Sequence, residues 1–307
     1  MISQTTSSFF MVRPMAFSYN TETASTNLFQ NRNVNFQESP ASTAILEFDH
    51  MLHRMEKIGL HITVFDQLDD STPDAVFPNN WISMHSDGSL VLYPMLTNNR
   101  RKERRTDIVE RLQNQYVINQ VIDLTHFEQE NKFLEGTGSI VFDHINKRAY
   151  ACLSERTNQE VLLHLCEILQ YTPFVFTATD KNVPMYHTNV ILNIGVGYAV
   201  LCAEAIPDIK QRKNLERILA FTGHEVILIT LAQMRCFAGN MLQVEDKTSK
   251  KYTLLSTSAI RSLKFAQIDV IIKNSELVSF DIPTIEIVGG GSVRCMIAEV
   301  FSQLKND

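Results

Sequence analysis

One cysteine, Cys295, follows a run of glycines near the carboxyl end of the chain. Residues 289–291 are all glycine, and Arg294 stands directly before the cysteine. Flexible backbone, free amide N–H groups and a nearby guanidinium would together lower the pKa of the thiol and favour a thiolate nucleophile. A single cysteine on an apolar run is more often a core residue, so the interpretation depends on partner residues elsewhere.

Two further residues have the types that a nucleophilic thiol needs. Such a thiol requires a proton acceptor and an acid that holds an imidazole in one tautomer. His187, in YHTNVILNI, and Glu135, in LEGTGSIVFD, each stand where an apolar run opens. We predict that they meet Cys295. The alternatives are a hydrogen-bonded histidine at a strand end and a turn residue beside two glycines.

Elements that would position these residues alternate along the chain. Helical periodicity is followed by a β-type apolar run five times. The predicted helices cover residues 45–60, 105–115, 159–169, 209–221 and 256–265, and the strands after them read HITVF, YVINQVIDL, PFVFTA, EVILIT and IDVIIKN. This order predicts an α/β protein.

Each of these strands leads into a Gly-, Asn- or Ser-rich turn that opens a second apolar run. Aligning Asn80, Gly138, Asn189, Asn240 and Cys295 gives spacings of 58, 51, 51 and 55 residues. Regular spacing of one supersecondary unit is typical of an array or propeller, and we favour it over an ordinary open α/β sheet. Units around a common axis would bring these polar openings into one central cleft.

Composition narrows the function classes. At 307 residues and 44% hydrophobic, the chain can bury the core of one large domain or two ordinary ones, and the repeat favours a single catalytic domain over residues 1–307. With 28 Lys and Arg against 34 Asp and Glu, the net charge gives no electrostatic reason to expect nucleic acid or an anionic membrane surface. We find no stretch with the pattern of a secretion signal or a membrane helix.

The cysteine and histidine patterns favour a reduced protein without a metal. The five cysteines are widely spaced and contain no C-x-x-C pair, which fits a cytoplasmic protein better than a disulfide framework or a zinc site. His50 and His53 have helical spacing, but no third ligand stands near them. We therefore expect no metal and no organic cofactor.

Several motifs in a fixed order carry a family resemblance. PDAVFPNNW, NNRRKE, LEGTGSIVF, CLSERTNQE, YHTN and the late Cys295 together resemble the guanidino-group modifying superfamily. Its members include dimethylarginine dimethylaminohydrolases, arginine deiminases and amidinotransferases. The resemblance extends from about residue 73 to the end and implies a five-bladed α/β propeller with a pseudo-fivefold repeat, the pentein fold.

The resemblance also implies roles for three catalytic residues. Cys295 matches the nucleophile, His187 the general acid and base, and Glu135 the carboxylate that supports His187 or the substrate nitrogens.

Three more positions match groups that bind substrate in the family. Asp74, in PDAVF, matches an acid that contacts the substrate head group. Arg156 and Arg100 match arginines that bind the carboxylate of the amino-acid substrate. A planar guanidinium can donate two hydrogen bonds to a carboxylate, which fits this role. Arg101 is nearly as good a candidate as Arg100. Taken alone, Arg156 would be a surface residue at a helix start, and the basic run from Arg100 a solvated helix start.

The chain departs from the family at two places. Dimethylarginine hydrolases have a Glu-Asp pair where this chain has Asn79 and Asn80, and deiminases have His-x-Asp where it has His187, Thr188 and Asn189. Each amide removes a negative charge and adds N–H donors. A guanidinium offers only donors and carries a charge, whereas a ureido group is neutral and also has an acceptor oxygen. The asparagines therefore predict citrulline, or a close ureido amino acid, as substrate.

This combination of PNNW and HTN resembles the citrulline-utilisation hydrolases of the superfamily. The expected reaction releases ornithine, ammonia and carbon dioxide through a covalent cysteine intermediate. Asp74 and Glu135 remain acidic, however, and succinylarginine dihydrolases resemble this chain in having neutral groups in the cleft. Deiminase, dihydrolase or amidinotransferase action on arginine or a substituted arginine is therefore the second reading.

A third reading is a non-catalytic propeller that binds an amino acid or a protein. The expected partner in the first two readings is a small amino-acid substrate, and a homo-oligomer is possible. We also expect a strand that carries Arg13 and then a loop over residues 21–39 that could cover the cleft.

Overall fold

The computed structural model describes residues 3–32 and 39–305. These residues form a mixed α/β fold of five three-stranded sheets and one two-stranded ribbon. All five larger sheets share one topology: their first two strands are antiparallel, and their second and third strands are parallel. Because parallel neighbours need a crossover connection, each unit has helical structure between its second and third strands.

Four units follow one another along the chain. Their strands and crossover helices are β3 (Ile82–Met84), β4 (Ser89–Leu92), α2 (Asn98–Arg101), α3 (Thr106–Gln115) and β5 (Gln120–Asp123); β6 (Ile140–Asp143), β7 (Arg148–Cys152), α5 (Gln159–Leu169) and β8 (Thr172–Phe176); β11 (Leu192–Gly195), β12 (Tyr198–Leu201), α6 (Ile209–Phe221) and β13 (Glu225–Leu228); and β14 (Leu242–Glu245), β15 (Lys251–Ser256), α8 (Thr257–Ser262), α9 (Phe265–Ile272) and β16 (Glu276–Phe280).

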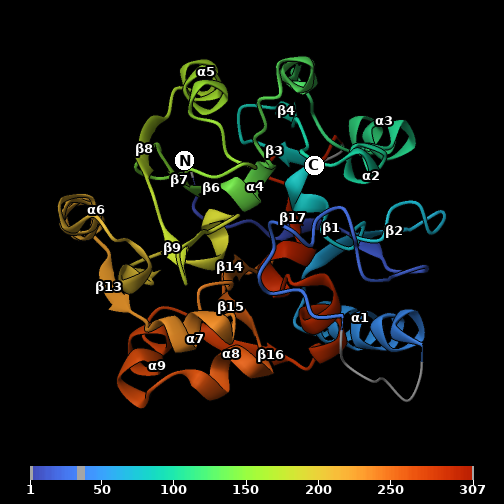
Figure 1. Ribbon diagram of the computed structural model, residues 1–307. Coiled ribbons are helices and arrows are strands. Elements are labelled where there is room, and N and C mark those ends of the chain that lie inside the picture. Colours follow the sequence, from blue (N-terminus) through green and yellow to red (C-terminus); the bar gives the residue numbers. More distant parts are fainter. Residues whose placement is uncertain (1–2, 33–38, 306–307) are drawn as a thin grey trace.

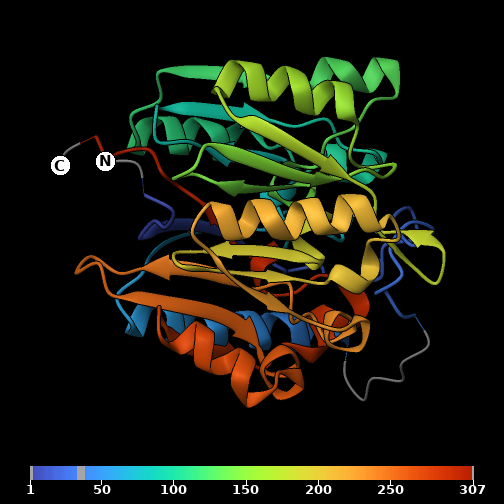
Figure 2. The ribbon, with the colours of Figure 1, turned by 90° about the vertical axis from the view of Figure 1, so that its left-hand side faces the viewer.

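The fifth unit joins the two ends of the described chain. It contains β17 (Ala298–Glu299), β1 (Ser8–Arg13), α1 (Pro40–Lys57) and β2 (His61–Asp66), with Phe9 opposite Glu299 and Phe10 opposite Ala298. Figure 1 shows the long helices at the periphery and the strands inside them, and Figure 2 shows the same units from the side. Contacts run between β17 and β3, and from β11 to both β6 and β14, so the first strands of the units lie near the middle.

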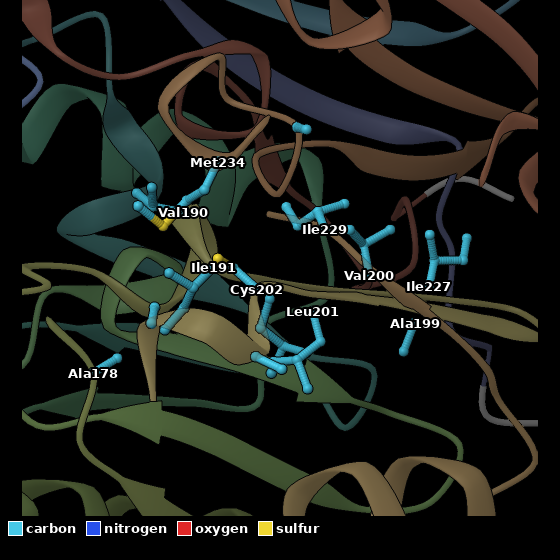
Figure 3. Close-up of a cluster of buried hydrophobic side chains, with 14 of the residues drawn as sticks. Ala178, Val190, Ile191, Ala199, Val200, Leu201, Cys202, Ile227, Ile229 and Met234 are labelled. Atoms are coloured by element: carbon cyan, nitrogen blue, oxygen red, sulfur yellow. The ribbon is translucent and has the colours of Figure 1, made fainter. Parts of the chain in front are cut away.

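Apolar residues pack between neighbouring units. The largest cluster gathers around β12 and β13, where Val200, Leu201 and Ile227 pack with Val190 and Met234 (Figure 3). Strand β12 is buried along its whole length, which is why YAVL reads as a continuous apolar run, whereas β13 has both exposed and buried residues. The buried clusters fix the units against one another and hold the central residues in place.

Short helices precede the inner strands at the centre. They are η1 (Pro78–Asn80), α4 (Gly136–Ser139), η3 (Thr188–Val190), α7 (Leu231–Arg235) with the turn that follows it, and η6 (Val293–Met296). These are the Gly-, Asn- and Ser-rich openings of the sequence repeat. The remaining elements are η2 (Thr125–Glu130), η4 (Ala203–Ala205), a π-helical turn (Ile285–Gly289), and the ribbon β9 (Thr179–Asp180) with β10 (Val183–Pro184).

One predicted strand is wrong. IDVIIKN belongs to helix α9, and the strand of that unit is β16, eight residues further on than the apolar run suggests. The side chain of Gln267 accepts a hydrogen bond from the Lys264 N–H and caps the helix. A short apolar run alone does not distinguish a helix from a strand. Here the capping hydrogen bond of Gln267 marks the start of a helix. Within the described residues, no helix is long and apolar enough to cross a membrane.

Candidate active site

His187 and Glu135 form a buried pair at the centre of the fold. The Nε2 atom of His187 lies 2.8 Å from Oε2 of Glu135, and the Leu96 N–H donates to Oε1 of the same carboxylate at 3.1 Å. A carboxylate accepts hydrogen bonds, so Nε2 carries the proton and Nδ1 is the acceptor of the neutral ring. The pair thus leaves one basic nitrogen available.

Two guanidinium groups neutralise this carboxylate. The Nη1 atom of Arg156 lies 3.5 Å from Oε2 of Glu135, and that of Arg100 lies 4.0 Å away. Burial acts to raise the pKa of Glu135, but Arg156, His187 and Arg100 outweigh it and lower the pKa to about 2. Burial lowers the pKa of His187 to about 4, although Glu135 acts in the opposite direction. At neutral pH the site therefore holds an ionised Glu135 and a neutral His187.

Glycine at position 138 lets the site close around the imidazole. A Cβ atom on Gly138 would lie 2.7 Å from Nδ1 of His187 and still closer to the Asn80 amide nitrogen. Gly136 has a φ of +47°, and a Cβ atom there would lie 2.8 Å from the Asn80 carbonyl oxygen. The EGTG segment is thus glycine-rich because two other central segments pack directly on its backbone.

Cys295 lies between two amides. The Nδ2 atoms of Asn240 and Asn189 are 3.3 Å and 3.6 Å from its Sγ atom. Burial raises the pKa of the Cys295 thiol, and the Ser292 backbone, Asn240 and Arg294 only partly oppose this. The predicted lowering of this pKa is therefore wrong for the resting site, because the thiol is 3% exposed. Arg294 is engaged elsewhere, with Glu299 at 2.8 Å.

The two adjacent asparagines have defined orientations. Arg100 Nη1 donates to Oδ1 of Asn80 at 2.7 Å, and a guanidinium can only donate, so the other end of this amide is its N–H₂ group. That group donates to Oδ1 of Asn79 at 3.0 Å. Nδ2 of Asn79 is then the free end, and this buried atom has no hydrogen-bond partner among the described residues.

Asp74 leaves a complementary atom free. Its Oδ2 accepts hydrogen bonds from Asn20 at 2.7 Å and Thr23 at 3.2 Å, whereas its buried Oδ1 has no partner within the described part of the chain. Burial raises the pKa of Asp74, while Arg100, Asn20 and Arg156 act to lower it. Among the described residues, Asn79 thus carries an unsatisfied donor and Asp74 an unsatisfied acceptor.

The structure distinguishes Arg100 from Arg101. Arg100 is buried and makes a two-bond contact with Glu103 at 2.8 Å and 3.0 Å. Arg101 points away and bonds to the carbonyl oxygens of Met95 and Leu96. NNRRKE is therefore only partly the solvated helix start that its charge suggests: Lys102 is exposed, whereas Arg100 and Glu103 are buried.

Arg156 is also buried rather than a surface residue. It donates to the Thr23 carbonyl at 3.0 Å and to the Thr26 hydroxyl at 3.1 Å, and it lies 5.1 Å from the centre of the Tyr186 ring. These contacts come from the loop that the sequence suggested as a cover. Thr23 and Thr26 of this loop therefore contact the site, whereas residues 33–38 fall outside the described part of the chain.

This arrangement has the groups for nucleophilic substitution at a planar C–N centre. It combines a thiol, two amide donors at that thiol, and a neutral imidazole that a carboxylate orients. No cluster of His, Cys, Asp and Glu that could hold a metal ion occurs in residues 3–32 and 39–305.

A comparison with known families decides the relationship. The sequence model described as eukaryotic N,N dimethylarginine dimethylhydrolase matches residues 13–302, which is nearly the whole chain. The chain belongs to this family. This family lies within the guanidino-group modifying superfamily that the motifs resemble.

Solved structures show the same fold. ArgZ, a cyanobacterial arginine dihydrolase of the ornithine–ammonia cycle, superimposes with a TM-score of 0.76 at 15% identity, over 98% of this chain and 41% of that one. Its N-terminal domain with bound substrate gives 0.76 at 14% identity, covering 96% and 99%. A dimethylarginine dimethylaminohydrolase gives 0.66 at 14% identity, also covering 96% and 99%. The chain thus spans about two fifths of full-length ArgZ.

No curated protein matches the chain significantly.

All nine site residues predicted from the sequence are buried around this centre. They are Asp74, Asn79, Asn80, Arg100, Glu135, Arg156, His187, Asn189 and Cys295. Direct contacts connect Glu135 with His187 and both arginines, and Asn189 with Cys295.

Sequence reasoning missed three residues of the site. Asn240 opens a repeat unit, but no motif assigns it a role in the site, although its amide lies nearer to the thiol than that of Asn189. Asn20 and Thr23 bond to Asp74 from a loop without periodicity. The repeat alignment could have identified Asn240, whereas no pattern pointed to the other two.

Proposed function

We propose that the protein hydrolyses a ureido amino acid, citrulline, to ornithine, ammonia and carbon dioxide. The observation that carries this proposal is that the buried Nδ2 of Asn79 and the buried Oδ1 of Asp74 each lack a hydrogen-bond partner among the described residues. A ureido group has both an acceptor oxygen and donor nitrogens. A guanidinium has only donors, so the Asn79 amide would stay unsatisfied, at a cost of roughly 1–3 kcal/mol.

The charge distribution supports the same substrate. Arg156 and Arg100 already lie beside Glu135, so this carboxylate has little remaining attraction for a cationic head group. Around the thiol the polar groups are the neutral amides of Asn189 and Asn240. These donors suit an oxyanion better than a guanidinium carbon with three nitrogens.

The proposed mechanism begins with His187 as the base. Nδ1 of His187 accepts the Cys295 proton, and Sγ attacks the ureido carbon. Asn189 and Asn240 donate to the resulting oxyanion. Collapse breaks the bond to the side-chain nitrogen of ornithine, which takes the proton from His187, and leaves an S-carbamoyl cysteine.

Water completes the reaction. His187 removes a proton from a water molecule that attacks the carbamoyl carbon, and the regenerated thiol takes that proton. The released carbamic acid breaks down to ammonia and carbon dioxide. Asp74 is proposed to accept from the ureido nitrogens, and Asn79 and Asn80 to orient the head group. Arg100 and Arg156 are proposed to serve the substrate carboxylate, which requires each to exchange part of its present contacts.

Action on arginine or a methylated arginine is the second candidate. The free Oδ1 of Asp74 could accept from a guanidinium and supply its counter-charge. The family description names dimethylarginine, and ArgZ is described as an arginine dihydrolase. This candidate predicts a different covalent species on Cys295.

Acid quenching during turnover and mass analysis of the Cys295 peptide separate the two. Citrulline should leave only a carbamoyl group on the peptide, because ornithine departs first. An adduct that retains the amino-acid backbone, formed from arginine while citrulline leaves none, would overturn the ureido proposal. The Cys295→Ala protein is the control in both experiments.

We also infer that the five sheets are the blades of a five-bladed α/β propeller, and that residues 1–307 make a single catalytic domain. The shared strand order and the sheet built from β17 and β1 support this interpretation. Limited proteolysis that released a stable fragment containing two or three sheets would contradict it.

A further inference from the structure

Glu286 is a buried carboxylate beside the segment that carries Cys295. It stands in the π-helical turn Ile285–Gly289 and is 6% exposed. Its Oε1 accepts a hydrogen bond from the Ser292 hydroxyl at 2.6 Å, and its backbone carbonyl accepts from the Gly290 N–H at 2.9 Å. Glu286 therefore contacts the middle of the glycine run through its backbone and the residue after the run through its side chain.

Ser292 connects this carboxylate to the cysteine. Its carbonyl oxygen accepts from the Cys295 N–H at 2.9 Å, and it directly precedes η6 as the N-cap residue. The hydroxyl and the carbonyl of one residue thus link Glu286 to the backbone of Cys295. A displacement of Ser292 would change where Sγ lies between the amides of Asn189 and Asn240.

The glycine run needs such a restraint. Three successive glycines have more conformational freedom than any other tripeptide, and Gly290 has a φ of +65°. Gly289 and Gly291 cannot be replaced by a stiffer residue, because a Cβ atom on either would lie 2.8 Å from the Phe77 ring. The hydrogen bond across the run supplies rigidity that side chains within it cannot.

We propose that Glu286 is a positioning residue, which fixes the turn through Ser292 so that Sγ of Cys295 stays between its two amide donors. The proposal rests on the role of Cys295 in the proposed function. It does not depend on whether the substrate is a ureido or a guanidino compound.

Other charged groups surround Glu286. Glu47 of α1 accepts from the Thr284 and Ile285 N–H groups at the start of the same turn, and Asp281 precedes it. Asp180, Lys181 and Arg235 line a cavity that Glu286 also lines. Burial raises the pKa of Glu286 to about 7, Ser256 and Ser292 act to lower it, and Glu47 and Asp281 to raise it. Its ionised fraction thus changes near neutral pH.

The ionised form accepts the stronger hydrogen bond from Ser292. The turn should therefore be held better above pH 7 than below it. Glu103 has a pKa raised by burial to about 7 as well, against the effect of Arg100, so only a variant can assign an activity change near pH 7 to Glu286.

The test compares Glu286→Ala, Glu286→Gln and Ser292→Ala in the full chain. We expect kcat to fall roughly tenfold or more in Glu286→Ala, with KM little changed. The kcat of Ser292→Ala should fall by a similar factor. The double variant should be no worse than either single variant. Glu286→Gln should recover most of kcat at pH 8, because its amide oxygen still accepts from Ser292, and it should lack the activity change near pH 7.

Iodoacetamide alkylation of Cys295 tests the proposal without substrate. The half-point of its pH profile should move upward in Glu286→Ala, because the thiolate loses amide donors, while the partly exposed Cys236 is the internal control. An unchanged Cys295 profile, or additive effects of the two single variants, would overturn the proposal. If no substrate is turned over, the alkylation profile still decides this question separately from the proposed function.

Discussion

The imidazole of His187 donates from Nε2 to Glu135 Oε2 across 2.8 Å, and the carboxylate lies between this ring and two arginines. The arginines keep Glu135 ionised, so the ring keeps one tautomer with Nδ1 free. The arginines thus set the charge of Glu135, and Glu135 sets the tautomer of His187. The proton transfers of the proposed reaction therefore depend on a residue that need not touch the substrate carbon.

Removing the charge of Glu135 should impair these proton transfers. In Glu135→Gln the amide can accept from Nε2 or donate to it, so the tautomer is no longer fixed. Arg156 also loses the carboxylate beside it, whereas Arg100 keeps its contact with Glu103. We expect kcat to fall by roughly 10²–10⁴-fold at pH 7.5, measured by ammonia release. The exposed Glu110→Gln on α3 is the control. Activity within a factor of two of the natural protein would contradict this role.

The contact between Gly138 and His187 gives a steric prediction. In Gly138→Ala the new methyl group would lie 2.7 Å from Nδ1 of His187, so the ring or the short helix must move. We expect activity to be lost with a free energy of unfolding lowered by about 1–3 kcal/mol. Gly223→Ala is a suitable control, because its Cβ atom meets nothing within 4 Å and only the φ of +90° is unfavourable. Both activity and urea denaturation should be measured for each variant.

The orientation of the Asn79 amide predicts a change in specificity. Asn79→Asp replaces the free donor by an acceptor with a negative charge, which favours a guanidinium over a ureido group. The ratio of kcat/KM for citrulline to that for arginine should fall roughly tenfold or more. Asn98→Asp, at an exposed position, adds the same charge outside the site. An equal loss for both substrates would show that Asn79 does not read the head group.

The sequence predicted the elements best where their ends are chemically marked. Helices α5 and α6 begin and end where expected, because Asn158 and Asp208 cap their first N–H groups. IDVIIKN was mispredicted because a continuous apolar run shows neither helical nor strand periodicity. The residue that caps this helix, Gln267, is also of a type common at protein surfaces, so it gave no clear signal.

Several features of the site could not be predicted from the sequence, because they depend on residues that are distant along the chain. The segment Asn98–Arg101 is too short to show a face, so the choice between Arg100 and Arg101 needed tertiary structure. Local residues indicated a low pKa for Cys295, whereas its burial comes from several distant segments. Asn20 reaches Asp74 across 54 residues of sequence, which no local pattern encodes.

The buried histidines predict a pH dependence of stability. The pKa of His187 falls to about 4 in the folded state, so the unfolded chain binds its proton first as the pH drops. The stability that the neutral ring contributes is present above pH 6.5 and is lost as the pH falls toward 4, at up to roughly 1.4 kcal/mol per pH unit.

Urea unfolding at several pH values between 7 and 4 measures this effect. His85, whose pKa burial also lowers to about 4, contributes the same trend, so the comparison must be made with His187→Gln. The variant should lose less stability over this range than the natural protein. Parallel curves for the two proteins would mean that His187 does not resist protonation in the folded state.

Parallel turnover of the candidate substrates tests most directly whether the neutral amides select a ureido head group. Purified protein should be given citrulline, arginine and dimethylarginine separately, with ornithine and ammonia measured and Cys295→Ser as control. Release of ornithine and ammonia from citrulline, with little product from the other two, is the predicted result. Turnover of arginine or dimethylarginine while citrulline stays intact would show that Asp74 suffices to hold a cation and that the amides do not select a ureido group.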